Sequence, residues 1–236
     1  MTTTIHEVAD NIFRISTPLP PEVVPGGFSF NQYLIRDEAP LIFHTGPRRI
    51  FPLVREAIAT VMPIERLRYV AFSHIEADEM GALNEFLAAA PEATAVCSNV
   101  AALVSGDMAD RPPLGLADQQ LLSLGKHAVR WLDTPHMPHG WECGYMFEES
   151  TKTLLCGDLF TQPGSGGAPL TEGDILGPSE AFRTQGMDYY SYTEKARPLL
   201  EKLAATKPET LACMHGSAWR GDGAALLMEL ADALTS

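Results

Sequence analysis

The chain has 236 residues, a formal net charge of −13 and a sequence pI near 4.9. This acidity argues against a nucleic-acid binder, because phosphates require a basic surface. Apolar stretches fall short of the roughly 18–20 residues that cross a bilayer, and the N-terminus lacks the pattern of a secretory signal, so we expect a cytoplasmic protein without a membrane partner. At 45% hydrophobic residues, the chain suffices for a single domain over residues 1–236.

In the first half, pairs of apolar runs are followed by alternating apolar runs and helical patterns. Pro63 and Pro91 are stop signals for two helices, and Ser98 or Asn99 is a suitable N-cap for a third. We expect strands at 12–15, 32–35, 39–44, 69–72 and 94–97, and helices at 50–62, 80–90 and 98–104.

The second half repeats this alternation. We expect strands at 129–132, 143–147, 153–156 and 210–214, and helices at 188–205, interrupted by Pro198, and at 224–234, with Asp222 as a cap. The Gly/Pro-rich segment 163–178 is long enough to predict a functional flap. Together the halves predict an α/β fold with four αββα layers, in which two sheets pack face to face with helices outside.

Four cysteines are scattered along the chain without a Cys-x-x-Cys pair (Cys97, Cys143, Cys156 and Cys213). This pattern is typical of reduced, buried cysteines that pack as small hydrophobic residues.

The most informative motif follows the apolar run 69–72. His74, Glu76 and Asp78 alternate along the chain, so an extended backbone directs them to one side. Such a polar set at a buried strand end is unfavourable without a partner. A metal ion is the partner that these residue types indicate.

Polar groups follow three further apolar runs. They are His136 with His139, then Asp158, then His215, and glycines lie beside His139, Asp158 and His215. Glycine allows the backbone to approach a bound ion closely. One histidine after a strand is usually structural, but four such strand ends in one chain favour a shared metal site.

The order of these motifs resembles the metallo-β-lactamase superfamily, whose first motif is usually His-x-His-x-Asp-His. In this chain Glu76 replaces the second histidine and Glu79 the last. The His-x-Glu-x-Asp form resembles the di-iron domain of flavodiiron proteins and of stand-alone oxygen-binding di-iron proteins. The segments 139–142 (His-Gly-Trp-Glu) and 214–219 (Met-His-Gly-Ser-Ala-Trp) are similar to motifs of that branch, and Asp158 follows His139 by nineteen residues, as it does there.

The resemblance implies six ligands for two irons, with Asp158 bridging them. One iron would be bound by His74, Glu76 and His139, and the other by Asp78 and His215. His136 is the rival of His139, which ligand spacing favours. In the family, the position of Glu79 is a histidine that binds iron in some members and points away in others. Glu79 therefore either binds the second ion or hydrogen-bonds a bound water, and we favour the water.

Other residues have two interpretations each. His44 stands where the superfamily often has an aspartate, and is either a partner behind a ligand or a structural cap. Glu142 either orients His139 or is a solvated loop residue. Five aromatic residues either line a pocket near the metals or, as we favour, belong to the core (Tyr189, Tyr190, Tyr192, Trp141 and Trp219). We assign no role to His6 and His127.

Charge bears on the metal and its chemistry. Two divalent ions carry four positive charges, which three carboxylates and a bridging hydroxide would balance. A hydrolase motif with one carboxylate fewer is more positive, which suits a Lewis acid. The extra carboxylate oxygen favours iron or manganese over zinc and stabilises the oxidised pair.

Our first hypothesis is a non-haem di-iron protein that binds or reduces a small diatomic ligand, O2 or NO. The sequence has no flavodoxin-type phosphate loop, so we expect no flavin bound by this chain and a separate flavodoxin- or rubredoxin-like electron donor. Without a donor, the protein would be an oxygen-binding sensor. The resemblance also implies a homodimer.

The alternative is a zinc-dependent hydrolase of thioesters, lactones or phosphoesters, with a metal-bound hydroxide as nucleophile and segment 163–178 as a lid. A third hypothesis is a degenerate member in which Glu79 disables the second ion.

Overall fold

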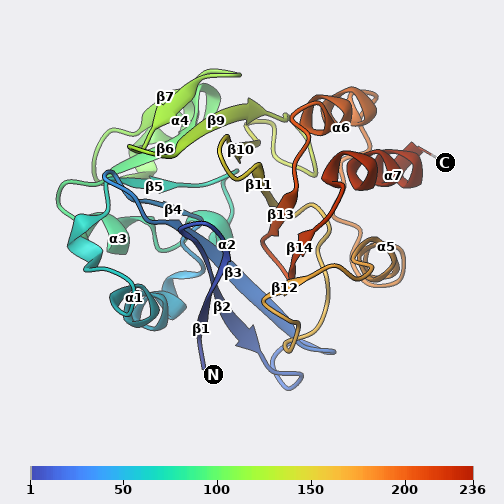
Figure 1. Cartoon of the computed structure of the whole chain (residues 1–236), viewed down its shortest axis with the longest axis horizontal. Helices are drawn as coiled ribbons and strands as arrows, with labels where there is room; N and C mark the ends of the chain where they lie inside the picture. Colours follow the sequence, from blue (N-terminus) through green and yellow to red (C-terminus); the bar gives the residue numbers. More distant parts are fainter. Residues whose placement is uncertain (1, 236) are drawn as a thin grey trace.

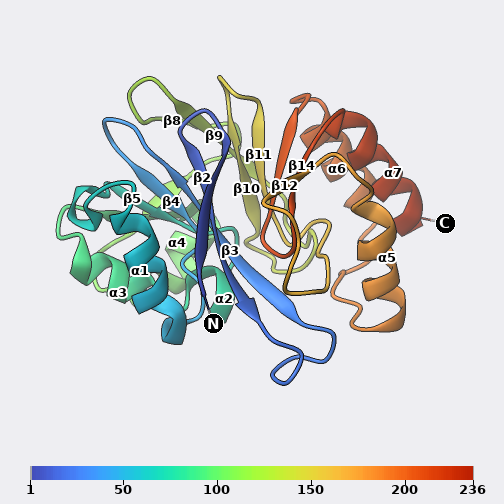
Figure 2. The same ribbon diagram turned by 60° about the horizontal axis from the view of Figure 1, so that its bottom comes forward.

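Two seven-stranded β-sheets pack face to face between two layers of helices (Figures 1 and 2). The computed structural model describes residues 2–235. The first sheet has the order β1 (Thr4–Ala9), β2 (Ile12–Leu19), β3 (Phe28–Ile35), β4 (Leu41–Phe43), β5 (Tyr69–Ala71), β6 (Thr94–Ser98) and β7 (Leu114–Leu116). The second has the order β12 (Leu170–Thr171), β14 (Ala218–Arg220), β13 (Thr210–Cys213), β11 (Thr153–Gly157), β10 (Gly144–Glu148), β9 (Ala128–Asp133) and β8 (Leu121–Ser123).

Helices cover the outer face of each sheet (Figure 2). The first sheet is flanked by α1 (Phe51–Ala59), α2 (Ala77–Met80), α3 (Leu83–Ala89) and α4 (Asn99–Ser105). The second is flanked by α5 (Leu176–Gln185), α6 (Ala196–Ala204) and α7 (Gly223–Thr235). Short 3-10 turns lie at Arg48–Ile50, Ile64–Arg66 and Gly106–Met108. The predicted four-layer αββα fold is confirmed.

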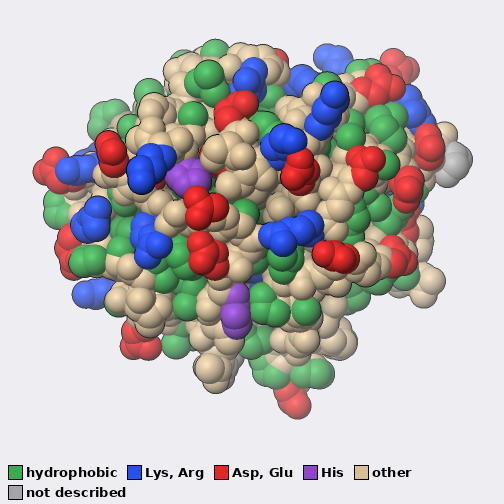
Figure 3. Space-filling model, in the orientation of Figure 1, with side chains coloured by type: hydrophobic (Ala, Val, Ile, Leu, Met, Phe, Trp, Pro, Cys, Tyr) green, Lys and Arg blue, Asp and Glu red, His purple; other side chains and the backbone are tan. Residues whose placement is uncertain are grey.

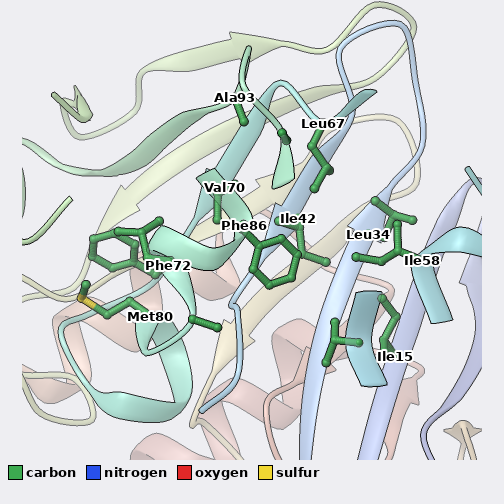
Figure 4. Close-up of a cluster of buried hydrophobic side chains, with 14 of the residues drawn as sticks. Ile15, Leu34, Ile42, Ile58, Leu67, Val70, Phe72, Met80, Phe86 and Ala93 are labelled. Carbon is green, nitrogen blue, oxygen red and sulfur yellow. The ribbon is translucent and has the colours of Figure 1, made fainter. Parts of the chain in front are cut away.

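Three apolar layers hold the four structural layers together. Side-chain alternation along β3 directs Leu34 to the helical side and Tyr33 and Ile35 to the layer between the sheets. The outer layer of the first sheet packs Leu34 and Ile42 near Phe86 of α3 (Figure 4). Because both faces of each sheet are covered, the central strands are apolar on both sides, as the apolar runs in the sequence predict.

Differences from the predicted elements occur in both halves. The predicted helix 188–205 is reduced to α6, in which Pro198 occupies the first turn, where a missing N–H is tolerated. Segment 163–178 contains β12 and the start of α5, whose Gly177 and Pro178 weaken its helical signal. The predicted helix 80–90 is divided into α2 and α3 around Gly81. The five strands β1, β7, β8, β12 and β14 were not predicted either.

The predicted caps and cysteine states agree with the structure. Ser98 Oγ accepts a hydrogen bond from Ala101 N, and Asp222 Oδ1 accepts one from Ala225 N. All four cysteines are free and buried. Among the described residues, no helix is long and apolar enough to cross a membrane. Acidic and basic side chains are interspersed on the face in Figure 3.

Three buried polar side chains of the first sheet bind the backbone at the end of β13, and we call Arg14, Asn31 and Tyr33 the inter-sheet clasp. Asn31 Nδ2 donates to Cys213 O at 2.9 Å and to Gly216 O at 2.8 Å. Arg14 Nη2 donates to Gly216 O at 2.6 Å, and Tyr33 Oη donates to Cys213 O at 2.8 Å. The clasp therefore fixes the segment that carries His215 against the opposite sheet.

We expect Asn31→Ala to lower the free energy of unfolding by about 1–3 kcal/mol, because it removes two buried hydrogen bonds between the sheets. Urea denaturation of the metal-free protein measures this change. The matched control is Asn84→Ala, which removes two hydrogen bonds that are exposed to water and should change stability by less than about 0.5 kcal/mol. Equal effects of the two substitutions would contradict a special contribution of the clasp.

Candidate metal centre

The polar strand ends of both sheets meet at one edge of the sandwich. The motif after β5 comes from the first sheet, whereas Asp158 and His215 follow the parallel strands β11 and β13 of the second. The loop between β9 and β10 adds His139. Among the described residues, two groups of side chains could each hold a metal ion: His74, Glu76, His139 and Asp158 in the first, and Asp78, Glu79 and His215 in the second.

The donor atoms of the first group are spaced like ligands of one ion. Glu76 Oε2 lies 3.2 Å from His74 Nε2 and 3.0 Å from His139 Nε2, and the two imidazole Nε2 atoms are 2.9 Å apart. Asp158 Oδ2 lies 3.6 Å from each imidazole Nε2. Ligands bound at roughly 2.0–2.2 Å to one ion are about 3–3.5 Å apart, so these separations fit a metal.

Asp158 also reaches the second group. Its Oδ1 lies 3.3 Å from His215 Nε2, which in turn lies 3.4 Å from Asp78 Oδ2. The two oxygens of one carboxylate therefore face different groups. This is the arrangement that a bridging carboxylate requires.

Hydrogen bonds on the far side of the imidazoles fix their orientation. His139 Nδ1 donates to Tyr189 O, and His215 Nδ1 donates to Ser29 O, each at 2.8 Å. Donation from Nδ1 leaves the Nε2 lone pair directed into the site, as in metal-binding histidines generally. Ser29 and Tyr189 contribute backbone carbonyls, which no side-chain pattern in the sequence could have indicated.

His74 is oriented by a buried chain of contacts. Its Nδ1 lies 2.9 Å from Ser73 Oγ, which lies 2.9 Å from His44 Nε2, and His44 Nδ1 lies 3.0 Å from Met214 Sδ. Burial lowers the pKa of His44 to about 3, so its imidazole is neutral. The structure thus places His44 behind His74, outside both groups.

The pocket has an excess of negative charge. Burial alone lowers the pKa of an imidazole, yet the pKa values of His74, His139 and His215 are all raised by their neighbours, chiefly carboxylates and, for His74, Cys143. Burial raises the pKa of Asp78, and the charge of Asp158 adds to this effect. The three imidazoles and Asp78 therefore hold protons more tightly than usual, so the site attracts positive charge.

Glu76 keeps its place in the first group although its side chain is half exposed. Hydrogen bonds from His139 and His74 lower its pKa to about 2. Its carboxylate is therefore ionised and held between the two imidazoles.

Two residues considered in the sequence lie outside both groups. His136 is exposed. Glu142 is buried, and its Oε1 accepts a hydrogen bond from Ile75 N at 2.8 Å. Glu142 therefore supports the backbone of the first motif and is not a solvated loop residue.

A cavity of about 210 Å³ lies over both groups. Phe28, Thr161, Met187 and Tyr189 line it together with the polar side chains. Segment 163–178 does not contribute to its lining, so the predicted flap is wrong for this cavity, and residues 187–189 lie there in its place. Segment 163–178 instead packs near the turn before β3, where Gly164 N donates to Gly27 O.

The other aromatic residues and histidines have separate positions. Tyr190 is buried, and Trp219 packs against the cluster beneath α6 and α7, as a core role predicts. Trp141 and Tyr192 are exposed. His127 is buried beside Glu148, 3.1 Å from its Oε1, and His6 lies on β1.

Comparison with known proteins supports the resemblance. The model of the "ODP family beta lactamase" matches residues 28–216. Rubredoxin-oxygen oxidoreductase of Megalodesulfovibrio gigas is 26% identical over 207 residues, which cover 84% of this chain and 50% of that protein. The chain spans between 24% and 50% of the length of the curated relatives that it matches.

Solved structures give the same picture of the fold. The flavodiiron protein of Giardia intestinalis superposes with a TM-score of 0.82 at 19% identity, covering 99% of this chain and 60% of that one. The Flv1 flavodiiron core of Synechocystis sp. PCC6803 superposes with a TM-score of 0.79 at 22% identity, covering 99% and 61%. The chain therefore belongs to the ODP family of β-lactamase-like proteins, and its fold is that of the metallo-β-lactamase-like core of flavodiiron proteins.

Proposed function

We propose that this chain holds two iron ions and binds or reduces O2 or NO with electrons from a separate protein. The observation that carries the proposal is the position of Asp158, whose two oxygens face two groups of metal-binding side chains. A single-metal protein has no use for this arrangement.

The ligand assignment follows the two groups. His74, Glu76 and His139 bind the first ion, Asp78 and His215 bind the second, and Asp158 bridges them. The separations of 2.9–3.6 Å between donor atoms support the assignment. His139 and His215 each donate a hydrogen bond from Nδ1 to a backbone carbonyl, which leaves Nε2 to bind a metal. These two hydrogen bonds support the ligand assignment independently.

Carboxylates favour iron over zinc at this site. Glu76 lies between two imidazoles, where the common hydrolase motif has a third imidazole. Its oxygen is a harder and anionic ligand, which stabilises the higher oxidation state. When bound, an iron pair supplies reversible one-electron chemistry at each metal. Manganese is the second metal that this ligand set suits.

The volume and lining of the cavity favour a small ligand over an ester substrate. Its volume of about 210 Å³ lies below the roughly 300–1,000 Å³ of sites that enclose larger organic molecules. Beyond the two metal-binding groups, Phe28 and Met187 form apolar lining, and Thr161, Asp188 and Tyr189 add polar atoms, without a basic side chain that would recognise a phosphate or carboxylate. A diatomic molecule needs no further recognition groups, whereas a thioester or phosphoester does.

The electron donor follows from the named relative. Rubredoxin-oxygen oxidoreductase takes its name from rubredoxin and oxygen, so a rubredoxin-like protein is the donor that we propose first. The proposal needs no flavin within this chain, because the electrons come from outside it.

Metal analysis with two activity assays tests the proposal. We expect two irons per chain after anaerobic loading with Fe²⁺, a visible absorption band after exposure to O2, and O2 or NO consumption with a reduced rubredoxin. The zinc-loaded protein should hydrolyse thioesters and lactones no faster than the metal-free protein. Ester turnover by the zinc form, with no consumption of either gas by the iron form, would favour the hydrolase.

Asp158→Ala should abolish binding of both ions, because it removes the shared ligand and leaves each ion one carboxylate short. Mass spectrometry of metal content after desalting measures the result. Asp133→Ala is the control, because Asp133 lies on β9 and accepts a hydrogen bond from Trp131 Nε1 away from the site. Retention of two ions by Asp158→Ala would contradict the bridge.

His139→Ala should weaken binding of the first ion by at least about 10–100-fold, since even partners behind a ligand have effects of that size. His136→Ala, three residues earlier and exposed, should bind both ions like the unmodified protein. Calorimetric titration with Mn²⁺ compares the two variants. Equal losses would mean that the loop conformation, and not ligation, controls the affinity.

A further inference from the structure

Glu79 is a buried carboxylate without a hydrogen bond, and its nearest basic group is the imidazole of His74 at 4.0 Å. It lies on α2 and is 0% exposed, and neither side-chain oxygen forms a hydrogen bond. Among the described residues, no lysine or arginine forms an ion pair with it. Burial of an unpaired carboxylate is costly enough that the group normally takes up a proton or a cation.

The position of Glu79 is fixed by its backbone. Its carbonyl oxygen accepts hydrogen bonds from Thr45 N at 2.8 Å and from Thr45 Oγ1 at 3.3 Å. Its side chain extends into the site, where a carboxylate oxygen lies within 4.8 Å of donor atoms of Asp78 and His215. Its Oε2 also lies 4.0 Å from His74 Nε2. The carboxylate therefore faces the place of the second ion.

We propose that Glu79 is a ligand of the second ion, which three carboxylates and one imidazole then bind: Asp78, Glu79, Asp158 and His215. This inference rests on the two-metal function proposed above and departs from our sequence-based expectation that Glu79 binds a water. The expectation relied on the family position, whereas the structure shows a buried carboxylate without a hydrogen bond, close to Asp78 and His215.

Ligation by Glu79 makes the two ions chemically different. The first ion has two imidazoles and two carboxylates, counting Asp158, and the second has one imidazole and three carboxylates. Oxygen-rich ligand sets favour hard cations such as Mn²⁺ and ferric iron. The four carboxylates together carry four negative charges, which balance the four positive charges of two divalent ions. Because glutamate is anionic and histidine neutral, the centre is one charge more negative than a centre with histidine at position 79. We therefore infer that Glu79 stabilises the oxidised pair.

Substitution with glutamine separates ligation from protonation. Glu79→Gln keeps the shape of a protonated carboxyl and its ability to donate a hydrogen bond, but it loses the negative charge. We expect this variant to bind the first ion normally and the second at least about 10–100-fold more weakly, measured by anaerobic titration with Mn²⁺ and by metal content. Two ions bound with unchanged affinity would overturn the proposal, because Glu79 would then be a neutral hydrogen-bond donor.

Two further variants complete the experiment. Glu148→Gln is the matched control, because Glu148 is also 0% exposed but accepts hydrogen bonds from Ser150 and Thr151 outside the site. It should bind both ions. Glu79→His replaces the carboxylate by a neutral ligand, so we expect two irons per chain and a midpoint potential above that of the unmodified protein, measured by spectroelectrochemistry. A potential equal to or below that of the unmodified protein would contradict the charge argument.

The outcome is independent of the reaction that the centre performs. Mn²⁺ titration reports the ligands even when the iron form consumes neither O2 nor NO. A protein that binds two ions, loses the second in Glu79→Gln and consumes no gas would retain the role of Glu79 and refute the proposed function. A protein that consumes O2 or NO, and whose Glu79→Gln variant binds both ions with unchanged affinity, would support the proposed function and refute the role of Glu79.

Discussion

Repulsion among buried acids is the constraint on which the rest of the site depends. Four carboxylates share one pocket with three imidazoles, and protons or metal cations are needed to balance them. The raised pKa values of Glu79 and Asp78, which burial causes first and Asp158 increases, are one sign of this imbalance. The three apolar layers must offset the cost of the pocket in the metal-free protein. Bound cations would reverse that cost, so metal binding should stabilise the fold.

The site also depends on the packing of the two sheets. His74 follows β5 of the first sheet, whereas Asp158 and His215 follow strands of the second, so neither sheet alone contains either group of metal-binding side chains. The inter-sheet clasp joins these two sources of ligands through Gly216, the residue after His215. Ser29 adds a second connection, because its carbonyl orients the His215 ring from β3. Loss of the interface would therefore separate ligands before it exposed most of the core.

The sequence predicts the parts of this protein that depend on neighbours along the chain. Apolar runs identify most strands, and the motifs that follow them contain all seven side chains of the two groups, although Glu79 was expected to contact a water. Of the partners behind the imidazoles, His44 was one of the interpretations offered from the sequence, but the backbone carbonyls could not be predicted. Ser29, for example, lies 186 residues from His215 and contributes a backbone oxygen. Asp188 and Tyr189 were assigned to the predicted helix 188–205, because the local sequence pattern gives no sign that they line a cavity. The burial of Glu79 could not be predicted from the sequence either, because an acidic residue on a four-residue helix is normally exposed to solvent.

Exposure varies among the side chains of the centre, and Glu76 and His139 form its open side. The side chains of Glu76 and His139 are 50% and 29% exposed, whereas those of His215 and Glu79 are 5% and 1% exposed. The ring of Phe28 lies 4.3 Å from that of His215 and shields it. Charges among the buried side chains are less screened by water, so in the proposed two-metal centre each buried carboxylate would affect the second ion more than Glu76 would affect the first. A small ligand that enters beside Glu76 and His139 would then meet the first ion, while the buried carboxylates would hold the charge that favours oxidation.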